Sequence, residues 1–291
     1  MKKINMVDLQ GQYKKIRSEV NREIKKVLKS ATFINGPIVK EFELNLKDFL
    51  GTKNVIPCAN GTDALQVALM SLGVEKGDEV ITPNFSFAST IEVILLLGLK
   101  PILVDIDPKT FNIDPTMIEK RITNKTRAII PVHLYGQSCR MNEIMEIAKK
   151  NHLEIIEDAS QSLGSKFKGK HSGTFSHLGC FSMYAAKVMT AGEGGAIVTD
   201  DKKLFEKLKQ IRNHGLSKNH ITNQFGLNLR LPEINAAIAK IQMKKLPTFL
   251  RQRKKNAQIL TEFLQNHDII LPEERKNEVM NWYLYTVALK Q

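Results

Sequence analysis

Apolar residues follow two different spacings along this chain, and the change of spacing outlines its elements. From Tyr13 to Lys29, apolar positions three or four residues apart are separated by Lys, Arg and Glu, which predicts an amphipathic helix. A second helical pattern runs from Ile38 to Leu50. Short runs rich in Val and Ile then alternate with helical stretches, and these runs cover residues 54–59, 78–82, 101–105, 127–134 and 153–157. Such strands, apolar on both faces, predict a mostly parallel sheet covered by helices.

The alternation changes after the fifth run. Two strands, a helix and a long helical stretch are predicted at residues 178–184, 196–199, 201–213 and 232–265, in that order. The long stretch is expected to bend or break at Pro247, and residues 282–289 predict a final strand. We therefore expect an α/β fold with an N-terminal arm and a large domain over residues 1–246, followed by the start of a small domain over residues 247–291.

The chain is basic, which raises the question of a nucleic-acid partner. It has 291 residues and a formal charge of +13, from 43 Lys+Arg and 30 Asp+Glu. Its lysine pairs at 14–15, 149–150 and 244–245 fall on different predicted helices and are not interleaved with aromatic residues. A nucleic-acid site needs cations gathered on one face, so we predict solvated helix surfaces and no nucleic-acid partner.

The apolar stretches and the cysteines argue against a membrane-spanning protein and against a cysteine metal site. The most apolar stretch, residues 94–106, is broken by two charged residues, a glycine and a proline, and falls short of the roughly 20 apolar residues that a membrane helix needs. The three cysteines, at 58, 139 and 180, lie far apart and form no CxxC pair. We therefore expect a cytoplasmic protein with neither a membrane span nor a metal site.

Polar and aromatic residues follow the ends of several predicted strands, where an α/β sheet places its ligand sites. Gly61 and Thr62 follow the first strand at the start of a helix, which suits either an ordinary helix cap or a phosphate. Phe87 follows the next strand, and such a ring either belongs to the core or stacks on a flat cofactor. Asp158 ends the fifth strand, where it either caps a turn or faces a protonated ring nitrogen.

Lys187 adds a candidate nucleophile to these strand-end residues. It follows the apolar run 178–184 and precedes the glycine-rich segment 192–195, so we expect it to be partly buried. Desolvation lowers the pKa of a lysine and makes it a nucleophile for Schiff-base formation. A lysine for an imine, an acid for a pyridinium, a ring face, and Gly, Thr and Ser donors for a phosphate together meet the needs of pyridoxal phosphate. The sequence therefore predicts this cofactor.

Eight ordered segments resemble the DegT-type family of pyridoxal-phosphate-dependent nucleotide-sugar aminotransferases. That resemblance implies the type I aminotransferase fold and runs nearly from end to end of the chain. The segments are 35–37 (NGP), 58–65 (CANGTDAL), 78–83 (DEVITP), 104–107 (VDID), 131–137 (PVHLYGQ), 157–161 (EDASQ), 192–195 (GEGG) and 226–231 (GLNLRL).

The resemblance implies roles for the residues around the cofactor ring. Lys187 would form the imine with the cofactor and then move protons between the cofactor and the substrate carbon. Asp158 would keep the pyridine nitrogen protonated, so that the ring acts as an electron sink. Phe87 would stack on the ring, and Gln161 would lie near its phenolic oxygen.

The resemblance also implies how the phosphate is bound. Gly61, Thr62 and Ser182 would bind the phosphate of their own subunit. Asn228 would reach the phosphate of the cofactor in a neighbouring subunit. The family therefore implies a homodimer whose active sites are shared between subunits.

The reaction that the resemblance implies has two halves. An amino donor, usually L-glutamate, would leave its amine on the cofactor, and the amine would then pass to a keto group of a nucleotide-linked hexose. Such products feed lipopolysaccharide O-antigens, other surface polysaccharides or aminosugar antibiotics. Residues 58–66 and 78–115 most resemble enzymes that aminate a 3-keto N-acetylated UDP-sugar acid, whereas the sequence GEGG at 192–195 is common among 4-keto enzymes, so the regiochemistry stays open.

One departure from the family concerns length. Family members usually extend well beyond the position that corresponds to residue 291, and residues 281–288 resemble only the first strand of their C-terminal domain. A missing part of that domain is expected to weaken activity. The alternative hypothesis is therefore a truncated, inactive or regulatory relative of these enzymes.

Overall fold

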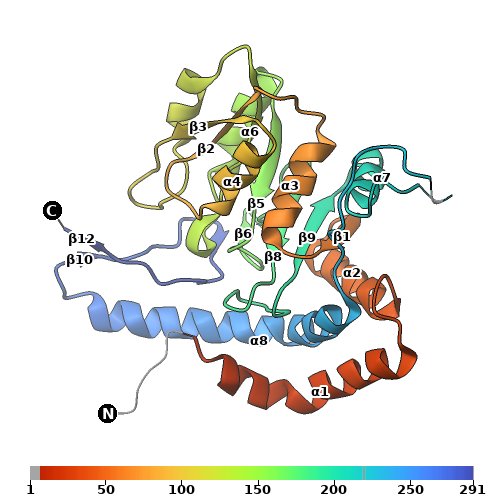
Figure 1. Cartoon of the computed structure of the whole chain (residues 1–291). Helices are drawn as coiled ribbons and strands as arrows, with labels where there is room; N and C mark the ends of the chain where they lie inside the picture. The colour runs from red at the N-terminus through yellow and green to blue at the C-terminus, as the bar shows by residue number, and fades with distance from the viewer. Residues whose placement is uncertain (1–6, 218, 220, 291) are drawn as a thin grey trace.

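The computed structural model describes residues 7–217, 219 and 221–290. At its centre lies a sheet of seven strands in the order β1-β9-β8-β5-β4-β2-β3 (Figure 1). These strands are β1 (Asn54–Cys58), β2 (Glu79–Pro83), β3 (Lys100–Val104), β4 (Thr126–Ile129), β5 (Glu154–Asp158), β8 (Leu178–Ser182) and β9 (Gly195–Thr199). Neighbouring strands from β8 to β3 pair in parallel, while β9 runs antiparallel to both β1 and β8. The predicted α/β fold with a mostly parallel sheet is confirmed.

Helices cover both faces of this sheet, because successive strand residues point to opposite sides. On the β1–β8 half, Val55 packs with α2 (Pro37–Leu50) and α8 (Glu233–Leu264) on one face. The next residue, Ile56, packs on the other face. The helices of that second face are α3 (Gly61–Ser71), α4 (Ser89–Leu96) and α7 (Lys202–Ile211).

Two further layers complete the arrangement. The short helix α5 (Pro115–Ile118), continued by the 3₁₀ turn η1 (Glu119–Arg121), and α6 (Met141–Lys150) pack on the β2–β5 half of the sheet. The long N-terminal helix α1 (Leu9–Ser30) lies along α8, outside the α2–α8 layer (Figure 1). Among the residues described, no helix combines the length and the apolar character that a membrane span requires.

Of the bend or break predicted at Pro247, the break is absent, because helix α8 continues through this residue. A proline inside a helix removes one backbone hydrogen bond, which costs about 3 kcal/mol. Leu246, directly before it, is fully buried in the core between α8 and α2, and this packing offsets the loss. The proposed division between residues 246 and 247 falls in the middle of this helix, so the two-domain organisation stays a prediction.

The segment after α8 forms two small sheets. Strand β10 (Ile269–Ile270) pairs with β12 (Ala288–Leu289), and β11 (Glu278–Val279) joins the hairpin of β6 (Lys166–Phe167) and β7 (Lys170–His171). The strand predicted over 282–289 is therefore wrong except at Ala288 and Leu289.

A side chain explains that difference. Trp282 has a left-handed backbone conformation with φ of 54°. Arg253 Nη1 donates to the carbonyl oxygens of Trp282 and Tyr283, both at 3.1 Å. The Arg253 side chain of α8 thus provides these two carbonyls with a hydrogen-bond donor, so they do not need the backbone N–H groups of a neighbouring strand.

Candidate active site

The carboxyl end of β5 carries Asp158, and this carboxylate is almost completely buried, with 4% of the residue exposed. Thr90 Oγ1, in the first turn of α4, donates to Asp158 Oδ2 at 2.9 Å. The backbone N–H of Ser160 donates to Asp158 Oδ1 at 3.1 Å. Each oxygen is therefore held by one donor, which fixes the orientation of the carboxylate.

Lys187 lies in the turn after β8, the strand that pairs with β5. Its backbone N–H donates to the carbonyl of Tyr184 at 2.9 Å, and its side chain is partly buried, as predicted. Burial lowers the pKa of Lys187, and the charge of Asp158 opposes part of that shift. The structure thus brings the predicted lysine and the predicted acid into electrostatic range of each other.

The C-terminal segment covers this lysine. Lys187 Nζ lies 4.9 Å from the centre of the Tyr283 ring, in cation–π geometry. Arg253 of α8 holds the backbone of that segment in place. No pattern in the sequence indicates this contact, because it depends on how the chain returns after α8.

A tight backbone approach lies at the carboxyl ends of β1, β5 and β8. A Cβ atom added to Gly61 would lie 2.7 Å from Ser182 Cβ and 3.3 Å from Ser160 Oγ. Gly61 and Thr62 open α3, where the first backbone N–H groups have no partner within the helix. Asn60 caps this helix by accepting from the N–H of Asp63 at 2.8 Å. The result is a small cradle of hydroxyl and N–H donors that suits a phosphate.

Gln161 and Phe87 occupy different settings around these strand ends. Gln161 is partly buried, and its Oε1 accepts from the backbone N–H of Tyr135 at 2.9 Å. Tyr135 has a left-handed backbone conformation, with φ of 57°. Phe87 is 68% exposed, and its carbonyl accepts from the N–H of Thr90, the residue that contacts Asp158. The Phe87 ring lies three residues before Thr90 and is exposed, so the alternative that it belongs to the core is wrong.

Asn228 is separate from this group. It is exposed, and its backbone pairs with Asn213 in an isolated antiparallel bridge. In the part of the chain that the structure describes, no hydrogen bond joins its side chain to the other predicted site residues.

A buried network lies directly behind Asp158. Glu157 has no exposed surface, and it accepts from His133 Nε2 at 2.9 Å and from the backbone N–H groups of Gly173 and Ser176, both at 2.7 Å. His133 Nδ1 accepts from the N–H of Cys139 at 3.0 Å, which leaves the ring proton on Nε2, facing Glu157. These contacts fix the end of β5. Sequence reasoning missed Thr90, Ser160 and this pair, although polar residues next to a strand end are the signal that could have found them.

A cleft of about 340 Å³ opens beside Lys187. The start of α1 and the middle of α8 form its walls. Its polar lining consists of Asp8, Gln12, Lys15, Gln252, Arg253 and Asn256. No group of three or more His, Cys, Asp or Glu side chains within the described ranges is arranged to hold a metal ion.

Known proteins resemble this chain over nearly its whole length. The sequence model of the DegT/DnrJ/EryC1/StrS aminotransferase family matches residues 14–291. The UDP-2-acetamido-2-deoxy-3-oxo-D-glucuronate aminotransferase of Pseudomonas aeruginosa is 41% identical over 287 residues, which cover 98% of this chain and 80% of the relative.

Solved structures agree with this match. A DegT DnrJ EryC1 StrS aminotransferase from Brucella abortus has a TM-score of 0.94 at 36% identity, covering 99% of this chain and 79% of that one. NtdA from Bacillus subtilis with bound cofactor PMP has a TM-score of 0.90 at 33% identity, covering 100% and 67%. Motifs, fold and strand-end geometry lead to one conclusion: the chain belongs to the DegT/DnrJ/EryC1/StrS aminotransferase family, which depends on pyridoxal phosphate.

Proposed function

We propose that this protein transfers an amino group from L-glutamate to a keto group of a nucleotide-linked hexose, with Lys187 and Asp158 as its catalytic residues. The observation that carries the proposal is a desolvated Lys187 with a lowered pKa, next to the buried carboxylate of Asp158 on the adjacent strand. A protonated lysine is not a nucleophile, so a lowered pKa is what imine chemistry near neutral pH requires.

The residues around the strand ends fit pyridoxal phosphate. The Gly61 cradle admits a phosphate where any Cβ would fill the space, and Thr62 and Ser182 add hydroxyl donors to it. Asp158, held by two donors, would face the pyridine nitrogen. Phe87 would stack on the ring and Gln161 would approach the phenolic oxygen. When bound, the cofactor supplies the electron sink for the bond that breaks at the substrate carbon.

The protein's own residues would handle the protons and exclude water. With its pKa lowered by burial, Lys187 Nζ can accept a proton from the substrate carbon and then donate it toward the cofactor. Tyr283 covers this amine and keeps water from it. Thr90 and the N–H of Ser160 hold Asp158 in one orientation while the charge on the ring changes.

The substrate class follows from the family and from the cleft beside Lys187. The Pseudomonas aeruginosa relative is named for a 3-oxo UDP-sugar acid, which favours a 3-keto substrate here, although the segment 192–195 favours a 4-keto one. Lys15 and Arg253 in the cleft lining provide cations for an anionic substrate. We place the product in surface polysaccharide synthesis, including lipopolysaccharide O-antigen.

We also propose a cytoplasmic homodimer with shared active sites. Asn228 is exposed, and the carbonyl of the next residue, Leu229, accepts from the N–H of Ala59 beside the phosphate cradle. From there it would reach the phosphate in the second subunit. Three buried cysteines in the free thiol form suit a reducing compartment. A mixture of Lys187→Ala and Asn228→Ala subunits should recover activity if sites are shared, and recovery no greater than the sum of the two would contradict it.

The enzymatic proposal is tested by adding pyridoxal phosphate to the purified chain, reducing with borohydride and mapping the peptides. The expected result is one pyridoxyl adduct, on Lys187, and none on the buried Lys240, which serves as the internal control. Absence of the adduct removes the proposal and leaves the inactive or regulatory alternative. A panel of 3-keto and 4-keto nucleotide sugars with glutamate as donor then decides the regiochemistry.

A further inference from the structure

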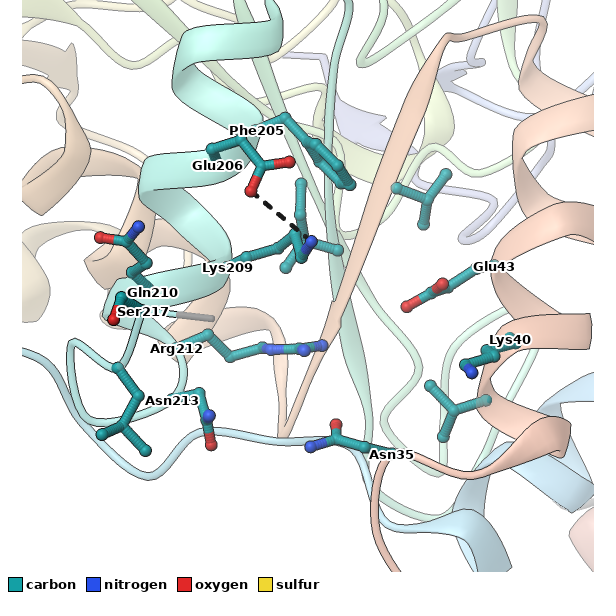
Figure 2. A pocket seen from close by; sticks show the side chains of 14 residues that line it. Asn35, Lys40, Glu43, Phe205, Glu206, Lys209, Gln210, Arg212, Asn213 and Ser217 are labelled. Carbon is teal, nitrogen blue, oxygen red and sulfur yellow. Dashed lines mark ion pairs between the residues drawn. The ribbon is translucent and has the colours of Figure 1, made fainter. Parts of the chain in front are cut away.

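A second cavity, of about 390 Å³, lies between α2 and α7 against strand β1 (Figure 2). Its volume is within the range of small-molecule sites. None of the predicted active-site residues lines it. Val55 and Ile56 form an apolar part of its wall, and charged side chains enter from both helices. The cavity is therefore distinct from the cleft beside Lys187.

Arg212, directly after α7, is the most unusual group in this cavity. Only 8% of the residue is exposed, and burial lowers the pKa of its guanidinium. Its Nη1 donates to the carbonyl of Pro57, but its buried Nε has no hydrogen-bond partner among the described residues. Figure 2 shows the side chain reaching across the cavity toward the α2 face that carries Lys40 and Glu43. A buried guanidinium with an unused N–H is costly, and its planar edge matches a carboxylate.

The remaining charges around the cavity have both signs. Lys209 Nζ lies 3.7 Å from Glu206 Oε2, so these two neutralise each other. Lys40, Arg212 and Glu43 make no ion pair within the described part of the chain. Burial raises the pKa of Glu43, and the nearby Arg212 charge opposes that shift. The unpaired set thus holds two cations and one acid.

We infer that this cavity binds an acidic α-amino acid, a molecule with two carboxylates and one ammonium group. Arg212 would take one carboxylate through its planar edge, Lys40 the other, and Glu43 the ammonium. The ligand's net charge of −1 complements the site's net charge of +1. Inorganic phosphate or a plain dicarboxylate would leave Glu43 facing an anion, and this selects against both. The inference goes beyond the proposed transamination and uses none of its residues.

The cavity wall is joined to the segment that carries Asn228. The N–H of Leu227 donates to the carbonyl of Ile211 at 2.7 Å, and that of Leu229 to the carbonyl of Arg212 at 3.0 Å. Arg230 Nη1 donates to Asn213 Oδ1 at 3.0 Å. A ligand that fixes Arg212 therefore stabilises residues 227–230, and amide hydrogen exchange of that segment should slow when the cavity is filled.

The test measures binding of labelled L-glutamate to the full chain by equilibrium dialysis. The holoenzyme is first reduced with borohydride, so that glutamate cannot react at Lys187. We expect one saturable site, weakened roughly tenfold or more in Lys40→Gln and Arg212→Lys, since the first loses a charge-assisted contact and the second keeps the charge but loses the planar edge that matches a carboxylate. Lys47→Gln, on the same helix but outside the cavity, is the matched control and should bind as the wild type does. Because Arg212 is buried, Lys40→Gln decides the matter if Arg212→Lys does not fold.

Competition defines the ligand class. Succinate, which lacks the ammonium group, and inorganic phosphate should compete poorly with glutamate in the wild type, and Glu43→Gln should reduce the preference for glutamate over succinate. The inference is overturned by the absence of saturable binding, by equal competition from succinate or phosphate, or by binding that only unreduced enzyme shows. The adduct at Lys187 is mapped without glutamate, and a chain that forms no adduct cannot react with glutamate there and is dialysed without the reduction step, so the two proposals fail separately.

Discussion

One buried and one partly buried lysine in this molecule show opposite electrostatic behaviour. Lys240, on α8, is 8% exposed, and its Nζ lies 3.0 Å from Glu23 Oε2 of α1 and also contacts Glu41 of α2. Burial lowers its pKa, but the hydrogen bonds that Lys240 donates to Glu41 and Glu23 outweigh this effect and raise it. Lys187 has no carboxylate within ion-pair distance in the described chain, and burial lowers its pKa.

Burial alone therefore does not make a lysine reactive. Lys240 is locked as a cation between three helices, where it fixes how α1 and α2 pack on α8. Lys187 faces the ring of Tyr283. The carboxylate of Asp158 acts on it through its charge but does not form an ion pair with it in the described chain. An amine in the second situation can lose its proton and act as a nucleophile.

The strongest test of this comparison exchanges the two lysines for neutral residues. Lys187→Ala should abolish transamination, because no other described amine near Asp158 takes its place, while the unfolding transition stays nearly unchanged. Lys240→Met should leave turnover within a few-fold of wild type at a temperature where the variant is folded. Measurable turnover by Lys187→Ala would remove the assignment of its role.

The second prediction concerns stability. Lys240→Met should lower the free energy of unfolding by about 3 kcal/mol, the low end for breaking a buried ion pair, since Glu23 keeps a second partner in Lys26 at 2.8 Å. Lys26→Met is the matched control, because its side chain is 59% exposed and its loss should cost less than about 1 kcal/mol. Urea denaturation of the three proteins measures both values, and equal losses would contradict the buried role of Lys240.

The contrast between these lysines also marks the limit of sequence analysis. The sheet, its helices and the group of Lys187, Asp158 and Gly61 could be predicted, because strand ends of an α/β sheet are determined by local pattern and share one edge. Nothing in the sequence distinguishes Lys240 from the other cations of a basic chain, since its burial depends on where α1 and α2 pack. Tyr283 is not predictable for the same reason, because it reaches Lys187 only through tertiary packing.

The third prediction is a loss of stability in acid. Burial raises the pKa of Glu23, but hydrogen bonds from Lys26 and Lys240 outweigh it and lower that pKa to about 2. A carboxylate with a depressed folded-state pKa stabilises the fold above its unfolded value of 4.5, and this contribution disappears as the pH falls from there toward 2. It amounts to about 3 kcal/mol at most. Unfolding curves between pH 6 and roughly pH 3 should therefore show a steeper loss in wild type than in Lys240→Met, and parallel curves would contradict the pairing.

The fourth prediction concerns the acid that accompanies Lys187. Thr90→Val removes the donor to Asp158 Oδ2 while keeping the shape of the side chain. Losing a hydrogen bond to a charged group costs about 1.5–3 kcal/mol, so cofactor affinity should fall roughly tenfold or more. Absorbance titration with pyridoxal phosphate measures this, and Thr90→Ser should restore it. Equal affinity in the wild type and Thr90→Val would show that Thr90 does not position Asp158.

The smallest effect is expected at Tyr283. Its ring contacts Lys187, whereas carboxylates contact Lys240. A partly exposed cation–π contact contributes about 0.5–1 kcal/mol, and we expect the ring also to keep water from the amine. Tyr283→Ala should hydrate Lys187, and we expect this to raise its pKa by more than the lost cation–π attraction, which favours the ammonium form, lowers it. Tyr283→Phe keeps the ring and should leave the pKa low. The measurement is the rate of reductive methylation of Lys187 against pH, by peptide mapping, with Lys240 as the protected reference. If Tyr283→Ala and wild type show the same pH profile, burial by the rest of the fold, and not this ring, lowers the pKa of Lys187.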